Sequence, residues 1–500
     1  MKGRQISKAG TDGGDETVDR CLRAGVAKSD ITTPGKGVLI KDPLYAKVLV
    51  LDDGTTKMAI IAMDVTEIGC TGDVSDDFLP KLRNRIQREL KISGRNVLVN
   101  ASHVHLPGRP LCNDVEQIDR TFDAVRRALQ NMTPVKVGAG RGHEDRITVN
   151  RTLRLKNGKD WTIRHANPCP PDEEVAGVGP IDPEIGILRV DRTDGRPLAV
   201  VYNFACHPLF GDPRGAISAN FPGFASKVIE ENLGNDAMAL FLQGAGGDII
   251  DAFFKDFNRA RDTESLGTML GLSTLKALKT IRSGDAKLRV ISETIKLPRR
   301  TDIRERIEEL RQEQTELCDS LRLTSLNFKS FLPLYIKYTL NPDYPADYSY
   351  RYMQEEKTGI DHLSAMDSHN KGCIRKYLQN IYAMERLTRI QDRIATFEFY
   401  KSLNDAAGEP TIRAEVQGLR VGDFVLITSP AEVLVEVGLN VKKVSPHKYT
   451  FMAACSNGYV YYGPPAEAYS RGGYEVTACL LAPEWQRIYE KKANEIIRAL

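Results

Sequence analysis

The sequence predicts an α/β fold, with mixed β-sheets flanked by helices and a helical insertion of about 100 residues. From about residue 22 to residue 300, short β-branched runs alternate with Gly, Pro and Asp turns and a few helices, and the same pattern returns from about residue 412. From about residue 301 to residue 405, apolar residues instead recur at helical spacing. The 500 residues are 41% hydrophobic and 27% charged, which is typical of a globular chain with a sizeable core.

The chain is expected to have three parts of unequal size. Residues 1–21 are polar and Gly-rich, so we expect a flexible tail. Residues 22–500 form one elaborated body, and residues 301–405 are inserted into it as a helical, tyrosine-rich segment. The sequence contains no internal repeat.

The insertion is expected to contain two amphipathic helices that pack against each other. The first follows the capping signal Thr301-Asp302 and has the apolar stripe Ile303, Ile307, Leu310, Leu317 and Leu321. The second has the stripe Ile374, Leu378, Ile381, Met384, Leu387, Ile390 and Ile394. Between them lie six of the 18 tyrosines: Tyr335, Tyr338, Tyr344, Tyr348, Tyr350 and Tyr352. We interpret this segment either as a loop packed on the body or as a surface that covers substrate or forms oligomers.

Composition excludes several classes of protein. The 69 basic and 66 acidic residues give a net charge of +3, and no basic block is long enough to follow a nucleic acid. The longest apolar runs, such as Met58 to Met63, are far shorter than the roughly 20 residues of a transmembrane helix. The nine cysteines form no CxxC pair. Because the first 20 residues contain no apolar signal region, we expect a cytoplasmic chain as given, or a secreted or periplasmic one if a signal peptide was removed.

Ligand-capable side chains follow several expected strands, at the ends where α/β sheets place their sites. The strand expected over residues 96–101 leads into His103 and His105, and the strand over residues 198–204 leads into His207. The strands over residues 237–242, 423–427 and 449–454 lead into Gly247-Asp248, into Glu432 and into the run from Asn457 to Tyr462.

His103 and His105 are the strongest single signal for a metal site. In extended backbone, residues two apart point to the same side, so both imidazoles can face one centre, although such a pair is also found as a structural or exposed feature. Zn²⁺ suits imidazole and carboxylate ligands with one position open for water. The sequence has no HExxH helix, no G-x-S-x-G elbow, and no GK[ST] ending on its glycine-rich loop.

Together, these residues resemble the catalytic domain of the neutral, non-lysosomal ceramidases and their bacterial relatives. The resemblance extends from about residue 22 to the C-terminus and keeps the order of the family's motifs. Those motifs are Asn100 to His105, Asn150-Arg151-Thr152, Ile181 to Glu184, Asn203 to Pro208, Ile217 to Gly223, Gly247-Asp248, Ser429 to Glu432, Asn457 to Tyr462, and Gly472 to Glu475.

The resemblance implies a zinc-dependent hydrolase that cleaves the amide bond of a ceramide-like, N-acyl substrate in lipid metabolism. It implies that Zn²⁺ is held by four ligands, His103, His207, Glu432 and Tyr462. It also implies that three further residues surround the scissile amide, His105, Arg151 and Tyr474, and that Gly247 and Asp248 form a substrate or oxyanion loop.

Several departures from the family keep other functions open. The family's Gly-Asp-x-Ser-Pro-Asn loop is replaced by Gly247-Asp248-Ile249-Ile250-Asp251, so its serine is missing and a zinc-activated water is the expected nucleophile. Leu106 to Pro110 replace a Gly-rich run, and Asn220 replaces an aspartate. The chain as given also ends before a C-terminal immunoglobulin-like domain. The alternatives are a zinc-dependent deacylase or esterase of carbohydrates or other small acylated compounds, and a catalytically silent binding relative. A small-molecule or lipid ligand is expected in each case, and homo-oligomer formation is left open.

Overall fold

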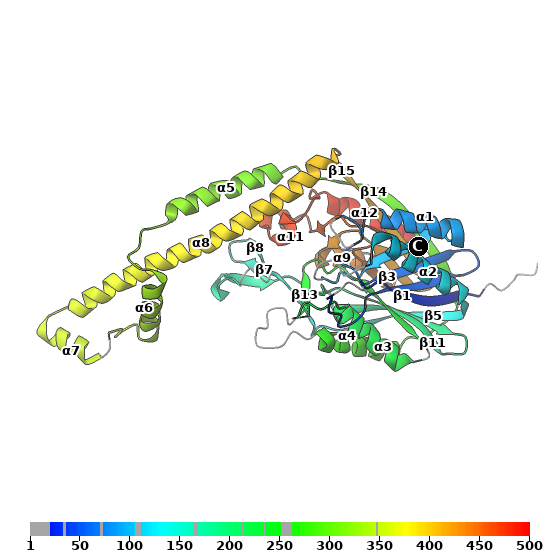
Figure 1. The fold of residues 1–500 in the computed structure, drawn as a ribbon, viewed down its shortest axis with the longest axis horizontal. Helices are drawn as coiled ribbons and strands as arrows, with labels where there is room; N and C mark the ends of the chain where they lie inside the picture. The colour runs from blue at the N-terminus through cyan, green and yellow to red at the C-terminus, as the bar shows by residue number, and fades with distance from the viewer. Residues whose placement is uncertain are drawn as a thin grey trace, which may run out of the picture. The chain divides into compact units, whose positions relative to one another are not determined.

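The computed structural model describes residues 21–33, 37–70, 74–105, 112–163, 169–209, 211–212, 214–234, 236–251, 263–346 and 349–500. These residues fall into two compact units (Figure 1). Unit 1 comprises the described residues within Met1–Pro298 and Thr411–Leu500, and unit 2 comprises those within Arg299–Pro410. The predicted α/β class is confirmed. The predicted tail, apart from Cys21, the run Leu106 to Pro110, and Tyr348 lie outside the described residues.

Unit 1 is built around an eight-stranded sheet with the spatial order β12-β11-β10-β5-β1-β2-β3-β4. Neighbouring strands are antiparallel except for the parallel pairs β3 with β4 and β11 with β12. The two edge strands approach each other, because the backbone N–H of Gln243 at the end of β12 donates to the Asn100 side chain in β4. The strands are β1 (Arg23–Asp30), β2 (Tyr45–Asp52), β3 (Lys57–Met63), β4 (Val97–Ala101), β5 (Thr133–His143), β10 (Glu184–Arg192), β11 (Pro197–Phe204) and β12 (Met238–Gln243).

A second sheet, in the order β14-β15-β16-β18, packs against one face of the first. Its strands are β14 (Leu288–Pro298), β15 (Thr411–Val421), β16 (Phe424–Thr428) and β18 (Tyr449–Ala453). Three smaller ladders complete the strands of unit 1. They are β6 (Thr148–Asn150) with β13 (Ile249–Asp251), β17 (Glu432–Val433) with β19 (Tyr462–Gly463), and β7 (Thr152–Leu155) with β8 (Asp160–Thr162) and β9 (Val175–Val178).

Helices cover the other face of the eight-stranded sheet, where α3 and α4 lie side by side (Figure 1). The alternation of side chains along β12 explains both layers. Leu240 and Leu242 face the second sheet, whereas Phe241 faces the helices. Because both faces are buried there, β3, β4, β11 and β12 are nearly continuous apolar runs rather than alternating ones. The helices of unit 1 are α1 (Phe78–Leu90), α2 (Asp114–Gln130), α3 (Asn220–Leu233), α4 (Thr263–Leu278), α9 (Val435–Lys443), α10 (Ala468–Arg471), α11 (Tyr474–Thr477) and α12 (Trp485–Ala499), with short 3-10 turns η1 (Gly94–Asn96) and η2 (Asp172–Glu174).

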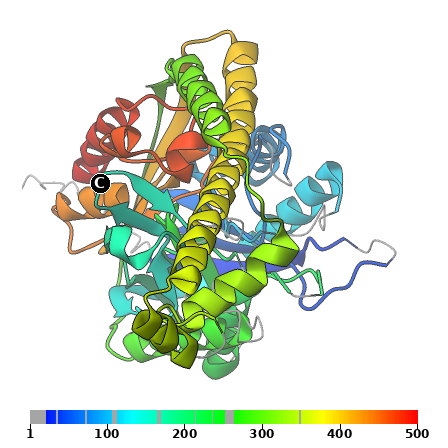
Figure 2. The same cartoon turned by 90° about the vertical axis from the view of Figure 1, so that its left-hand side faces the viewer.

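Unit 2 is helical, and its helices are α5 (Ile303–Ser320), α6 (Phe328–Leu340), α7 (Ser349–Thr358) and α8 (His362–Ala407). The predicted packing of the two amphipathic helices is confirmed, because α5 runs alongside α8 (Figure 2). Arg386 and Glu313 form one ion pair between them, with Nε and Oε1 2.7 Å apart. Within the described residues, no helix combines the length and the apolar character that crossing a bilayer requires.

Of the two interpretations of the tyrosine-rich segment, the loop is wrong, since most of the segment forms α6 and α7. An aspartate on α8 binds both of these helices. Asp367, which is 6% exposed, accepts hydrogen bonds from the hydroxyls of Tyr338 in α6 and Tyr352 in α7. The two short helices are thus held by polar contacts to a third helix, which no local sequence pattern indicates.

Candidate active site

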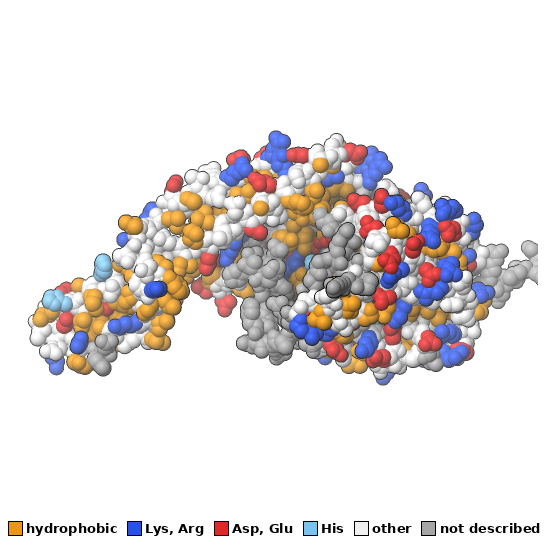
Figure 3. Space-filling model, viewed as in Figure 1, with side chains coloured by type: hydrophobic (Ala, Val, Ile, Leu, Met, Phe, Trp, Pro, Cys, Tyr) orange, Lys and Arg blue, Asp and Glu red, His pale blue; other side chains and the backbone are white. Residues whose placement is uncertain are grey.

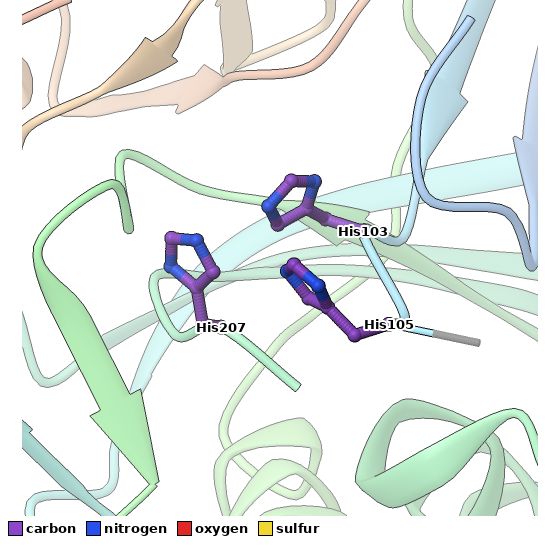
Figure 4. Close-up of side chains that lie close together, drawn as sticks. All are labelled: His103, His105 and His207. Carbon is purple, nitrogen blue, oxygen red and sulfur yellow. The ribbon is translucent and has the colours of Figure 1, made fainter. Parts of the chain in front are cut away.

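Three histidines from two strand ends meet in unit 1 (Figure 4). His103 and His105 follow β4, and His207 follows β11. The ring centroid of His103 lies 4.9 Å from that of His105 and 4.6 Å from that of His207, and one ligand nitrogen of each lies within 4.8 Å of the others. The expected convergence of His103 and His105 is confirmed, but the expected cause is wrong. His103 has φ of 63°, so the backbone there is left-handed rather than extended.

Left-handed backbone recurs around these histidines. Besides His103, Cys455 has φ of 50° and Tyr461 has φ of 62°, and none of the three is a glycine. Such conformations are unfavourable for residues with a Cβ and persist only where the surrounding structure holds them. The strain is concentrated where side chains from distant segments must be aimed at one point.

Backbone carbonyls orient both buried imidazoles. The Nδ1 atom of His103 lies 2.9 Å from the carbonyl oxygen of Thr66, and that of His207 lies 2.5 Å from the carbonyl oxygen of Gly246. A carbonyl can only accept a hydrogen bond, so the hydrogen-bond network assigns a proton to Nδ1 in both rings. The Nε2 lone pairs are therefore free to bind another group.

Both Nε2 atoms face the same carboxylate oxygen. Oε2 of Glu432 lies 3.1 Å from Nε2 of His103 and 3.0 Å from Nε2 of His207. Glu432 is 4% exposed, and Nε2 of His103 is a buried nitrogen without a hydrogen bond of good geometry. Two imidazole nitrogens and one carboxylate oxygen thus converge on one point, which is the donor set of a cation site. These residues fit a divalent metal ion such as Zn²⁺.

The electrostatics of this group also favour a cation. Burial lowers the pKa of His207 to about 4, although its hydrogen bond to Glu432 acts in the opposite direction, so the ring is neutral and able to bind metal. Burial alone would lower the pKa of His103, but the Glu432 carboxylate raises it well above its ordinary value. Burial would raise the pKa of Glu432, yet His103 and His207 hold it well below its usual range.

A two-residue parallel ladder brings Tyr462 beside Glu432. Glu432 in β17 pairs directly with Tyr462 in β19, and the backbone N–H of Glu432 donates to the carbonyl of Tyr461 at 3.0 Å. The ring of Tyr462 stacks on that of His207 with centroids 6.5 Å apart. All four of the residues that the family resemblance implies as metal ligands therefore lie in one cluster.

Two neighbours of this cluster were not singled out from the sequence. The Tyr459 hydroxyl donates a hydrogen bond to Oε1 of Glu432, and Glu67 forms a second potential metal-binding group with His103 and Glu432. Glu67 follows β3, which is parallel to β4, so the ends of both strands meet at one edge of the sheet. The rule about strand ends that drew attention to His103 could also have found Glu67.

Arg151 lies next to Tyr462 in a buried polar network. Its Nη2 atom donates to the Tyr462 hydroxyl at 3.0 Å, and its Nε atom donates to Oε1 of Glu475 at 2.7 Å. The guanidinium carbon lies 5.7 Å from the ring centroid of Tyr462 and 5.8 Å from that of Tyr474. Burial opposes the charge of Arg151, but Tyr462 and Glu475 raise its pKa, so it is a permanent cation beside the phenols.

Gly247 and Asp248 connect Arg151 to the segment that carries Glu432. The carbonyl of Gly247 accepts a hydrogen bond from Arg151 at 2.8 Å, and its N–H donates to the carbonyl of Val433 at 2.9 Å. Asp248 accepts from the side chain of Asn150 at 2.7 Å and from the backbone N–H of Val435 at 2.9 Å. In the described residues, both oxygens of the Asp248 carboxylate are thus occupied by structural hydrogen bonds.

No family model and no curated protein sequence matches this chain. Solved structures do match it in fold, among them two structures of ceramidases. The structure of neutral ceramidase from Pseudomonas aeruginosa aligns with a TM-score of 0.60 and 16% identity, covering 96% of this chain and 75% of that one. A structure of a ceramidase complexed with C2 aligns with a TM-score of 0.61 and 15% identity, with the same coverage. The chain has the neutral ceramidase fold. The resemblance carried by the motifs is thereby confirmed at the level of the fold.

The loop from Gly247 to Asp251 lacks the serine that the family resemblance implies. Ile250 stands there, is 2% exposed, and forms a bridge with His207. The neighbouring Ile249 is fully buried and accepts the backbone N–H of His207 through its carbonyl. Ile249 and Ile250 thus support the segment that carries His207, and neither position offers a hydroxyl nucleophile.

Proposed function

We propose that this chain is a Zn²⁺-dependent hydrolase that cleaves the linear amide bond of an N-acyl, ceramide-like substrate. The observation that supports it best is the convergence of two buried imidazole nitrogens on Oε2 of Glu432, at 3.1 and 3.0 Å. The ceramidase fold supports the class of substrate, since two of the solved structures that share it are of ceramidases.

The ion would be held by His103, His207 and Glu432, with Tyr462 as the fourth ligand. When bound, Zn²⁺ would supply Lewis acidity to a carbonyl oxygen and to water. The carbonyls of Thr66 and Gly246 would keep both Nε2 atoms aimed at the ion, because they fix the proton of each ring on Nδ1.

Arg151 and Tyr474 would stabilise the negative charge that develops on the amide oxygen. Two of the Arg151 nitrogens already bind Glu475, Gly247 and Tyr462, which holds the guanidinium rigidly. Among the described residues, its third nitrogen, Nη1, has no hydrogen-bond partner and is available to a substrate oxygen. Donors held in place before the reaction stabilise a developing oxyanion without reorganisation.

His105 would carry the proton that hydrolysis must deliver to the leaving nitrogen. It is the exposed member of the histidine group, whereas His103 and His207 are buried. Hydrolysis breaks the C–N bond, adds a hydroxyl to the acyl carbon and adds a proton to the amine. A general acid at the open side of the group can reach that nitrogen.

Metal analysis of the purified protein tests the metal site first. We expect about one Zn²⁺ per chain, and loss of that ion in His103→Ala and His207→Ala. His143→Ala is the matched control, since His143 has a 66% exposed side chain and should not alter the metal content. Full retention of the ion in both ligand variants would refute the ligand set.

A substrate screen on the metal-loaded protein then tests the reaction. Fluorogenic N-acyl sphingosines should be cleaved, and acetylated sugars and simple esters should not. Cleavage confined to the sugars or esters would assign the chain to the alternative class of deacylases. Metal binding without turnover of any amide or ester would identify a silent binding protein.

A further inference from the structure

Unit 2 exposes an unusual amount of apolar surface. Most of the exposed large hydrophobic side chains in the described parts of the chain lie there, although unit 2 comprises only Arg299–Pro410. In the space-filling view, hydrophobic side chains gather over the end of unit 2 that holds α6 and α7 (Figure 3). Apolar side chains that gather on one exposed helix indicate a candidate place of interaction.

Helix α6 has two apolar faces. The inner face packs within unit 2, where the 5% exposed ring of Phe331 stacks on Tyr377 with centroids 4.5 Å apart. The outer face carries large apolar side chains at positions i, i+4, i+7, i+8 and i+12, which form one stripe on a helix. These are Phe328 at 63%, Leu332 at 41%, Tyr335 at 40%, Ile336 at 47% and Leu340 at 81% exposed.

The charged side chains of α6 are all basic. Lys329 and Lys337 are exposed, and α6 contains no acidic residue. An apolar stripe of aliphatic and aromatic side chains, with one lysine on the same face and one beside it, is a composition found in helices that lie in the interface of a bilayer. The lysines complement anionic lipid headgroups, and tyrosine is favoured at the depth where apolar and polar regions meet.

The size of the stripe argues against a second protein chain. A helix of 13 residues is about 20 Å long and, at a width of about 10 Å, offers about 200 Å². Stable protein interfaces bury about 800 Å² on each partner. A bilayer needs no such area, because each apolar side chain that enters it contributes by itself.

We propose that the outer face of α6 docks unit 2 on the surface of an anionic lipid bilayer. Phe328, Leu332, Ile336 and Leu340 insert among the acyl chains, and Lys329 and Lys337 contact the headgroups. The inference goes beyond the proposed hydrolase, since it requires neither the metal site nor turnover.

Co-sedimentation of the full chain with vesicles tests the docking surface. We expect binding to mixed phosphatidylcholine and phosphatidylserine vesicles, with about 10-fold or greater weakening in the double variant Leu332→Asp/Ile336→Asp. Lys329→Gln/Lys337→Gln should weaken binding about 10-fold on the mixed vesicles only. Leu272→Asp is the control, because Leu272 is 53% exposed on α4 of unit 1.

A fluorescent probe reports insertion separately from binding. The emission of Leu340→Trp should shift to the blue on the mixed vesicles, and that of Leu272→Trp should not. Circular dichroism of every variant should match that of the parent, because the substituted side chains are exposed. Absence of vesicle binding, or binding that the Leu332→Asp/Ile336→Asp variant keeps in full, would overturn the proposal. A dimer that the same variant dissociates, without vesicle binding, would assign the face to a second copy and overturn it as well.

Discussion

The hydroxyl of Tyr459 donates a hydrogen bond to Oε1 of Glu432, while Oε2 of the same carboxylate faces His103 and His207. Tyr459 therefore fixes the rotation of the carboxylate and determines which oxygen is presented to the two imidazoles. Hydrogen bonds of this kind to a ligand side chain orient it and tune its affinity for metal.

Tyr459→Phe should weaken the binding of Zn²⁺ by about 10- to 100-fold, because Glu432 loses the partner that orients it. Competition with a chelator measures the dissociation constant. Tyr202→Phe is a matched control, since the Tyr202 hydroxyl is also buried but bonds to the carbonyl of Pro222 at 2.8 Å, away from Glu432. Equal metal affinity in the parent and in Tyr459→Phe would contradict the orienting role.

Glu475 and Arg151 should behave as one unit in stability. Both side chains are nearly inaccessible, at 3% and 4% exposure, so removal of either charge leaves the other buried and unpaired. Glu475→Gln and Arg151→Met should each lower the free energy of unfolding by about 3 kcal/mol, and the double variant should lose much less than the sum.

Urea denaturation of the parent, the two single variants and the double variant measures the coupling free energy between Glu475 and Arg151. The exposed pair Lys492 and Glu293 serves for comparison, with Nζ and Oε2 2.7 Å apart and side chains 25% and 48% exposed. Its coupling should stay below about 1 kcal/mol. If the losses in unfolding free energy for Glu475→Gln and Arg151→Met were additive, the two side chains would have no coupling free energy.

Gly247→Ala should damage both stability and metal binding. An added Cβ would lie 2.6 Å from the carbonyl oxygen of Glu432 and 3.0 Å from that of Val433, so the strand carrying the ligand must move. We expect a loss of about 1–3 kcal/mol in unfolding free energy together with weaker Zn²⁺ binding. In Gly177→Ala the Cβ meets open space, and both quantities should stay close to those of the parent. Unchanged metal affinity in Gly247→Ala would indicate that the loop relaxes without moving Glu432.

Asp64 should make stability depend on pH. Burial raises its pKa to about 6, from 3.8, against the attraction of Lys47. Between about pH 4 and pH 6 the folded state holds a proton that the unfolded state has lost, so stability falls as pH rises through this window. Asp64→Asn removes that loss and keeps an acceptor for the N–H of Tyr45, which now bonds to the carboxylate at 2.9 Å.

The stability advantage of Asp64→Asn should therefore grow between pH 4 and pH 6 and level off at no more than about 3 kcal/mol. Asp53→Asn should show the opposite trend. Burial would raise the pKa of Asp53, but hydrogen bonds from the backbone N–H groups of Thr56 and Leu288 lower it. Urea denaturation over a pH series checks both variants, and an Asp64→Asn advantage that does not vary with pH would contradict the assignment.

The strands that precede the site could be predicted from the sequence nearly to the residue. The run expected over residues 96–101 forms β4 (Val97–Ala101), and the run expected over residues 198–204 forms β11 (Pro197–Phe204). They are predictable because a strand buried on both faces is apolar along most of its length. His103 and His207 could be found for the same reason, as histidines within three residues of the ends of those strands.

The tyrosine-rich segment shows where local reasoning failed. Its prolines and tyrosines suggested a loop, yet α6 forms with Pro333 inside it, capped by Asn327. The hydroxyl of Tyr338 reaches Asp367, 29 residues away in the chain. Tertiary contacts of this kind override local propensity, and no sequence pattern within the segment predicts them.

By itself, the sequence determined the α/β class and the position of the helical insertion. It also determined that ligand-capable side chains follow the apolar strands. Each of these features follows from the pattern of burial along a short stretch of chain. Only the tertiary structure decided which oxygen of Glu432 meets the imidazoles, that Tyr462 lies beside it through the ladder of β17 and β19, and that Tyr459 and Glu67 join the group. These relationships depend on residues far apart in sequence and on the left-handed backbone of His103, which is stable only once the surrounding fold holds it.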